Sequence, residues 1–127
     1  MGDQTFDVTE EAYMTDLAGR QCTHCRSDSP AVDAAESASL LASLPGWAIR
    51  EESGIPVLRK QFRFPDFATA LAFANGVGAL AEAEDHHPRL VIEWGRVEVA
   101  WWTHAIRGLH LNDFVLAARS EALASRS

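Results

Sequence analysis

The sequence predicts an α+β domain of two layers, in which helices cover one face of an antiparallel four-stranded sheet. Short segments with alternating apolar and polar residues occur in two adjacent pairs, and the tight turn within each pair requires antiparallel pairing. Segments with apolar residues every three or four positions separate and follow these pairs, and a capped run of helix formers precedes them. The expected order is therefore helix, two strands, helix, two strands, helix, with the helices on one face of the sheet.

The first third of the chain is expected to contain an N-terminal extension followed by one helix and one hairpin. Residues 1–32 hold few large apolar residues, so we interpret them as an extension with a short helix over residues 10–17. Residues 33–127 form the single predicted domain. A helix is expected at residues 33–44, because Asp33 and Glu36 have capping spacing and "PG" ends the run. Strands should follow in the segments "WAIREES" and "VLRKQFRF".

The rest of the chain predicts a long helix, a second hairpin and a final helix. The long helix should run from Pro65 to Glu84 and the final one over "HLNDFVLAARSEALAS", with the strands "RLVIEW" and "VEVAWW" between them. The expected core stripe of the long helix is broad, which suggests burial against the sheet and also against a second subunit. This stripe comprises Phe67, Ala70, Leu71, Ala74, Val77, Gly78 and Ala81, with Phe73 and Leu80 beside it.

Composition and charge exclude several classes of partner. The net charge of −7 argues against direct nucleic-acid binding, which requires clustered basic residues. No apolar segment approaches the roughly 20 residues that span a bilayer, and the acidic start "MGDQTFDVTEE" is unlike a signal peptide. We therefore expect a cytoplasmic location and no membrane partner. The single C-x-x-C pair, Cys22 and Cys25, supplies at most half of a structural zinc site, and we assign it no function.

Three histidines and one aspartate are expected to converge at one end of the sheet. His86 and His87 lie between the long helix and the third strand, His104 follows the fourth strand, and Asp113 begins the last helix. Antiparallel pairing brings the start of the third strand beside the end of the fourth. General acid-base catalysis needs such a set: one ring to accept a proton, one to donate, and an acid to fix a tautomer. The alternative is that these are ordinary surface or capping residues.

A metal site is the other chemical interpretation of these residues. Glu82, His86, His87 and His104 are competent metal ligands. Adjacent residues in extended backbone point in opposite directions, so the two neighbouring histidines are awkward ligands for one ion. We therefore rank metal binding below proton transfer.

The spacing of these residues resembles the signature of the pterin-4a-carbinolamine dehydratases. From Glu82 the chain has three residues, then His86, His87 and Pro88, then five residues to Trp94, nine to His104 and eight to Asp113. The segments "LPGW", "GL..NDF.LAA" and "DLAGRQC..C" are also similar to bacterial members, so the resemblance covers nearly the whole chain.

The resemblance implies a hydro-lyase that converts 4a-hydroxytetrahydropterin to quinonoid dihydropterin and water, as a 4a-hydroxytetrahydrobiopterin dehydratase. It implies that His86 and His104 transfer protons, that His87 binds the pterin, and that neither a metal nor another cofactor is needed. Glu82, Asp113 and Trp47 match positions near the family's pocket. Asp113 would orient His104 or only stabilise the helix start, and Trp47 would line the pocket or belong to the core.

Two positions depart from what the resemblance leads us to expect. His110 stands where the family usually has a Ser or Thr helix cap, and histidine is a poorer cap, so we expect altered geometry near Asp113. Trp101 and Trp102 are bulky for positions beside the site and are expected to change its shape.

The resemblance also implies partners and an alternative function. Family members form homodimers or homotetramers and support aromatic amino acid hydroxylases by recycling their pterin. The alternative is a non-catalytic dimerisation or assembly module on the same fold. The retained histidines favour the dehydratase over this module, because a scaffold has no physical need for them. A metal-dependent hydrolase is a third hypothesis, which predicts stoichiometric zinc in the purified protein and loss of activity on chelation.

Overall fold

The computed structural model describes residues 17–23 and 29–126 of the chain, and it has the predicted α+β fold. Three helices and four strands follow in the expected order, with one short 3₁₀ turn before the last helix. The elements are α2 (Ala34–Leu41), β1 (Ala48–Glu52), β2 (Ile55–Arg63), α3 (Phe67–Glu84), β3 (Arg89–Glu93), β4 (Arg96–Trp101), η2 (His104–Ile106) and α4 (Leu111–Ala124). The helix expected over residues 10–17 falls almost entirely outside the described residues.

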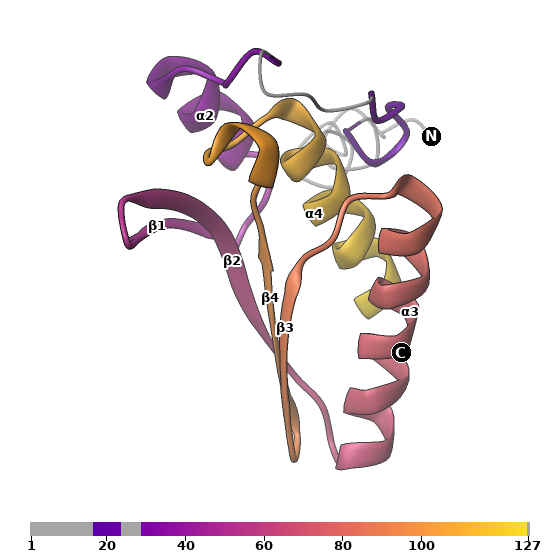
Figure 1. Cartoon of the computed structure of the whole chain (residues 1–127). Coiled ribbons are helices and arrows are strands. Elements are labelled where there is room, and N and C mark those ends of the chain that lie inside the picture. The colour runs from indigo at the N-terminus through magenta and orange to yellow at the C-terminus, as the bar shows by residue number, and fades with distance from the viewer. Residues whose placement is uncertain (1–16, 24–28, 127) are drawn as a thin grey trace, which may run out of the picture.

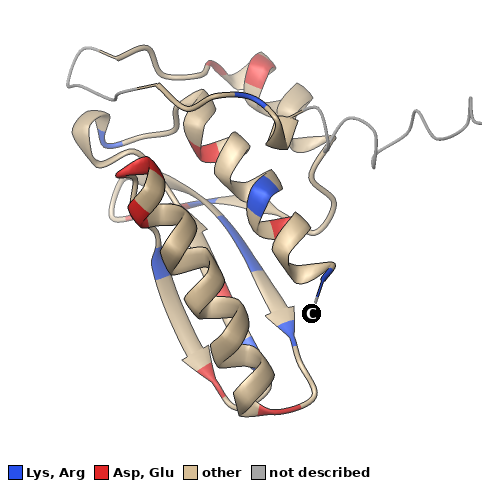
Figure 2. Ribbon diagram, turned by 90° about the vertical axis from the view of Figure 1, so that its right-hand side faces the viewer, with Lys and Arg blue, Asp and Glu red and all other residues tan. Residues whose placement is uncertain are grey.

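The four strands form one antiparallel sheet in the order β1-β2-β4-β3. Helices α3 and α4 lie side by side against one face of this sheet, as Figure 1 shows, and α2 lies near its upper end in that view. Seen from the helical side in Figure 2, α3 crosses in front of the strands and carries acidic residues at its C-terminal end. No helix of the described ranges covers the other face of the sheet.

The β1–β2 hairpin turns more tightly than the sequence suggested. Ser53 and Gly54 form its two-residue loop and both have positive φ, 52° and 81°. Two positive φ values in succession match the right-handed twist of the flanking strands, and a glycine adopts one of them without steric cost. Strand β2 therefore begins at Ile55, two residues earlier than expected, and pairs Ile55 with Glu52.

The core lies between the sheet and the two long helices. Strands β2 and β4 are central, and their inward side chains are fully or nearly fully buried. These inward residues are Leu58, Phe62, Val97, Val99 and Trp101, and they meet Phe114, Val115 and Ala118 of α4.

Four of the seven residues predicted for the core stripe of α3 are buried, and the stripe extends to Phe73 rather than to Phe67 and Leu71. Phe73 is at its centre, only 3% exposed, because its ring packs against Phe62 and Phe64 at centroid distances of 4.7 and 5.1 Å. The prediction that Phe67 and Leu71 belong to this stripe was wrong: they are 44% and 38% exposed. The apolar surface of α3 is thus divided between the core and solvent.

Part of the N-terminal segment packs onto α4. Leu17 is buried in the core, and the Arg119 guanidinium donates to the carbonyl oxygens of Ala18 and Arg20. The Asn112 side chain forms two hydrogen bonds with the backbone of Thr23, at 3.1 and 2.6 Å. Residues 17–23 therefore help to hold the start of α4 in place. None of the helices in the described ranges has the length and apolar character needed to cross a bilayer.

Candidate active site

Helix α3 ends in a turn that directs His86 toward α4. Asp85 adopts the left-handed conformation, with φ of 51°, and the His86 N–H donates to the carbonyl oxygen of Ala81 at 3.1 Å. A left-handed residue followed by this bond to a carbonyl five residues earlier is a Schellman motif, which ends a helix and reverses the chain. The motif therefore fixes the backbone of His86 before β3 begins.

The His86 ring is held by Asp113. Its Nε2 lies 2.7 Å from Asp113 Oδ1, and the two side chains are 8% and 0% exposed. The other carboxylate oxygen of Asp113 accepts hydrogen bonds from Thr103 Oγ1, at 2.6 Å, and from the backbone N–H of His110, at 2.9 Å. An ionised carboxylate only accepts hydrogen bonds, so this network places the hydrogen of His86 on Nε2. The Nδ1 atom is then the ring nitrogen left to exchange a proton with another molecule.

Asp113 does not orient His104, which was one of its two expected roles. All three donors that contact its carboxylate come from other residues of the described chain: His86, Thr103 and His110. Thr103 has extended backbone, so the next side chain, that of His104, is directed elsewhere. The other expected role, stabilising the start of α4, is present.

His110 caps α4 in place of the usual serine or threonine. Its Nδ1 accepts a hydrogen bond from the Asn112 N–H at 3.0 Å, while the Asp113 carboxylate accepts from the His110 N–H. This reciprocal arrangement is a capping box. Burial lowers the pKa of His110, which favours the neutral ring that the cap requires. The expected disturbance near Asp113 is therefore absent, because the imidazole supplies the acceptor that a hydroxyl would supply.

His87 and Glu82 form a pair at the surface. His87 Nε2 lies 2.7 Å from Glu82 Oε2, and the side chains are 50% and 78% exposed. An exposed pair of this kind contributes little to stability. It does restrict the His87 ring beside the site.

The three histidines line one small cavity at the end of the sheet. Its volume is about 210 Å³, and its lining combines the end of α3 with the residues that follow β4. The lining residues are Asp85, His86, His87, Thr103, His104 and Ala105. The antiparallel pairing of β3 and β4, with Arg89 opposite Ala100, brings these two segments together as expected. The cavity thus combines three imidazoles, one carboxylate and one hydroxyl.

Trp47 lies in the core and is not among the residues that line this cavity. It is 5% exposed, its ring packs edge-on against Phe62, and its Nε1 donates to Glu121 Oε1 at 2.9 Å. This position matches the expected alternative that Trp47 is a core residue. The prediction that Trp47 lines the substrate pocket is not supported by this position.

Sequence patterns gave no indication of Thr103, whose hydroxyl donates to Asp113. His110 was noted only as a poor helix cap, and its backbone hydrogen bond to Asp113 was not expected. In the described parts of the chain, no three or more His, Cys, Asp or Glu side chains are grouped so that they could hold a metal ion. The absence of a cofactor requirement stays a prediction. Cys22 is half-buried, and its C-x-x-C partner lies outside the described residues.

Relatives with known names match nearly the whole chain. A protein of Gloeobacter violaceus named "Putative pterin-4-alpha-carbinolamine dehydratase 1" is 54% identical over 110 residues, covering 87% of this chain and 95% of the relative. A protein of Saccharophagus degradans with the corresponding name is 51% identical over 110 residues, covering 87% of this chain and 97% of the relative.

Two solved structures share the fold. A protein of Brucella melitensis described as a transcriptional coactivator/pterin dehydratase superposes with a TM-score of 0.68 at 30% identity, covering 75% of this chain and 99% of its own. A pterin dehydratase-like protein described as a RuBisCO assembly factor in the alpha-carboxysome has a TM-score of 0.54 at 26% identity, covering 65% of this chain and 93% of its own. The family model for pterin 4 alpha carbinolamine dehydratase matches residues 30–123, and this chain belongs to that family.

Proposed function

We propose that this protein is a dehydratase that converts 4a-hydroxytetrahydropterin to quinonoid dihydropterin and water. Its family membership supports the pterin substrate. The observation that carries the proposal is that His86, His87 and His104 line the same cavity. At about 210 Å³ this cavity is smaller than the roughly 300–1,000 Å³ of most ligand sites, which suits a small flat ring that remains partly exposed.

The proposed reaction needs one proton donor and one proton acceptor. The C4a–O bond of the substrate breaks, and the oxygen leaves as water after it takes a proton from one histidine. The N5–H proton passes to the other histidine, and its electron pair forms the C4a=N5 double bond. No electrons are gained or lost overall, and the two histidines exchange protonation states. Groups that transfer protons in this way typically contribute 10²- to 10⁴-fold to a rate.

His86 and His104 are the proposed proton-transfer pair. His86 presents Nδ1 for exchange because Asp113 holds the hydrogen on Nε2. A carboxylate that accepts from a catalytic imidazole fixes its tautomer and stabilises its protonated form during reaction. His87 is proposed to bind the pterin, with Glu82 restricting its ring. Asp113 acts as a positioning residue for His86.

The proposed biological context is the recycling of the pterin used by aromatic amino acid hydroxylases. A hydroxylase leaves the 4a-hydroxylated pterin, and loss of water converts it to quinonoid dihydropterin. The hydroxylase is thus a proposed functional partner of this protein.

We also propose that the protein forms a homodimer or homotetramer. Among the residues that the structure describes, five large apolar side chains are exposed, on α3, on the edge strand β3 and in the β3–β4 turn. They are Phe67, Leu71, Val91, Ile92 and Trp94. Exposed apolar surface beside an unpaired strand edge favours self-association.

The second candidate is a non-catalytic assembly module. It is supported by the likeness to the pterin dehydratase-like protein described as a RuBisCO assembly factor. Against it stands the hydrogen-bonded arrangement of His86, Asp113 and Thr103, because a scaffold does not need a buried, oriented imidazole beside a cavity.

The deciding experiment is a dehydration assay on freshly generated 4a-hydroxytetrahydropterin. The dehydratase predicts formation of quinonoid dihydropterin well above the uncatalysed rate, with the same rate after chelator treatment. A rate equal to the uncatalysed one favours the assembly module. Activity that chelators abolish, together with stoichiometric zinc in the purified protein, favours a metal-dependent enzyme.

A further inference from the structure

The His104 ring is stacked on the indole of Trp102. The ring centroids are 4.7 Å apart and the ring planes differ by only 9°. His104 itself is exposed and begins the three-residue turn η2, whose N-cap makes no side-chain hydrogen bond. Within the described residues, the His104 ring has no hydrogen-bond partner. The parallel stack is therefore the contact that restricts this ring.

Trp102 is supported from the uncovered face of the sheet. The Arg89 guanidinium carbon lies over the Trp102 ring, 5.9 Å from its centroid. A guanidinium at this distance from an indole is attracted to the electron-rich ring face. Trp102 thus has contacts with a cation from β3 and with the imidazole of His104.

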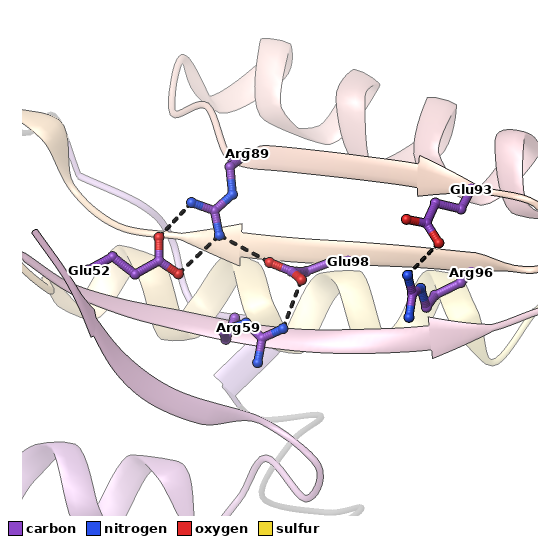
Figure 3. A network of polar contacts seen from close by, with 6 residues as sticks. All are labelled: Glu52, Arg59, Arg89, Glu93, Arg96 and Glu98. Carbon is purple, nitrogen blue, oxygen red and sulfur yellow. Dashed lines mark hydrogen bonds and ion pairs between the residues drawn. The ribbon is translucent and has the colours of Figure 1, made fainter.

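Arg89 is fixed by two carboxylates. It donates to both oxygens of Glu52, at 2.6 and 3.1 Å, and to Glu98 at 3.0 Å, as Figure 3 shows. Glu98 also accepts from Arg59 at 2.7 Å. Hydrogen bonds to both carboxylates raise the pKa of Arg89, so it is fully charged. The network connects β1, β2, β3 and β4 and fixes the guanidinium that contacts the Trp102 ring.

We propose that Trp102, supported by Arg89, is a positioning residue that holds the His104 ring for proton transfer. The proposal rests on the proposed function, in which His104 exchanges protons with the substrate. A free exposed imidazole samples several rotamers, and stacking on a parallel indole removes most of them. The indole face also attracts a cation, so the contact remains favourable when the imidazole carries a proton. Orienting a reacting group before the substrate arrives lowers the barrier.

The two histidines are thus held by different interactions. Hydrogen bonding to a buried carboxylate fixes His86, whereas aromatic stacking fixes His104 from the sheet face. Replacing Trp102 should therefore affect the orientation of His104 and leave the His86–Asp113 pair in place. The bulk of Trp102, unexpected beside the site, has a role in this arrangement.

The test combines NMR with kinetics on the full chain. In Trp102→Leu, the ring-current shift of the His104 Cε1–H resonance should disappear, whereas Trp102→Phe should keep much of it. We expect kcat for dehydration to fall about tenfold in Trp102→Leu with KM nearly unchanged, and to recover in Trp102→Phe, because misplacing a reacting group lowers the rate of the chemical step. In a His104→Ala background, Trp102→Leu should cause no further loss.

Arginine variants provide a matched control. Arg89→Met should partly reproduce the effect of Trp102→Leu on the His104 resonance. Arg96→Met also removes an arginine paired with a glutamate on the same sheet face, but its partner Glu93 lies at the far end of the strands. It should leave the His104 resonance unchanged.

Two results would overturn this inference. One is a His104 resonance that does not move in Trp102→Leu; the other is a Trp102→Leu protein with wild-type kcat. Both Trp102 variants should be checked for folding from their amide spectra, and Trp102→Phe decides the question if Trp102→Leu does not fold. If the wild-type protein has no dehydratase activity, the proposed function is wrong, and the resonance alone then decides whether Trp102 orients His104.

Discussion

At the scale of single residues, one carboxylate performs two structural tasks. Asp113 closes the capping box at the start of α4 and also accepts the hydrogen bond that orients His86. Because both tasks use the same side chain, the position of the His86 ring is linked to the stability of the helix start. Thr103, which follows β4, donates a further hydrogen bond to this carboxylate.

A substitution of Thr103 tests most simply whether hydrogen bonds to the Asp113 carboxylate hold the site together. Thr103→Val removes one donor to the buried Asp113 but keeps the side-chain shape. We expect the free energy of unfolding to fall by about 1–3 kcal/mol, because a buried carboxylate oxygen loses a partner. We also expect kcat for dehydration to fall several-fold. Thr103→Ser keeps the hydroxyl and is the control. Urea unfolding and dehydration kinetics that do not distinguish Val from Ser would contradict the role of this hydroxyl.

The sequence predicted the members of the site better than their contacts. Spacing identified His86, His87 and His104, because a strand pairing brings their segments together at one end of the sheet. It did not reveal which histidine Asp113 would contact, since that depends on the direction of side chains around Thr103. The sequence placed His110 at the helix cap but did not reveal that it caps well, because the acceptor role of its Nδ1 depends on local backbone geometry.

At the scale of elements, alternation, helical spacing and capping signals predicted the four strands and three α-helices given above to within a few residues, but not the 3₁₀ turn η2. The buried side of α3 was less certain because apolar residues occur on most of its surface. Phe73 occupies the central position because its ring packs against Phe62, in β2, and Phe64, which follows β2. The sequence of α3 alone does not show which of its apolar side chains fits the side chains of the neighbouring strand.

The ion pairs on the uncovered sheet face should make the free energy of unfolding depend on pH in the acidic range. Hydrogen bonding from Arg59, with a further contribution from Arg89, lowers the pKa of Glu98 to about 2. A lowered pKa in the folded state means that this contribution is complete above the ordinary pKa of a glutamate. It is lost as the pH falls from there toward about 2.

Glu98→Gln should therefore lower stability at neutral pH and flatten its acid dependence. We expect a loss of about 1–3 kcal/mol in the free energy of unfolding at pH 7, because a charged acceptor with two arginine donors is removed. The difference from wild type should shrink as the pH falls. Glu93→Gln, whose partner Arg96 forms an exposed pair, should change little. A constant difference between Glu98→Gln and wild type from pH 7 to pH 2.5 in urea titrations would contradict this account.

At the scale of the whole molecule, the exposed apolar residues should govern association. Leu71 is 38% exposed and lies one turn from Phe67, which is 44% exposed. Leu71→Glu places a charge in the proposed interface and should shift the protein toward monomer in sedimentation velocity. Ala72→Glu adds the same charge to an exposed position on another side of α3 and should keep the wild-type state. A wild-type protein that is monomeric at micromolar concentration would contradict the proposed assembly.

The measurement that most directly tests the central claim is the dehydration rate of His86→Gln and His104→Gln. If these rings transfer the protons, each substitution should lower kcat by about 10²-fold or more, while circular dichroism shows a folded protein. His24 lies outside the described residues and is not assigned to the site, so His24→Gln provides the control and should keep the wild-type rate. Wild-type kcat in both His86→Gln and His104→Gln would show that dehydration does not depend on histidine acid-base catalysis.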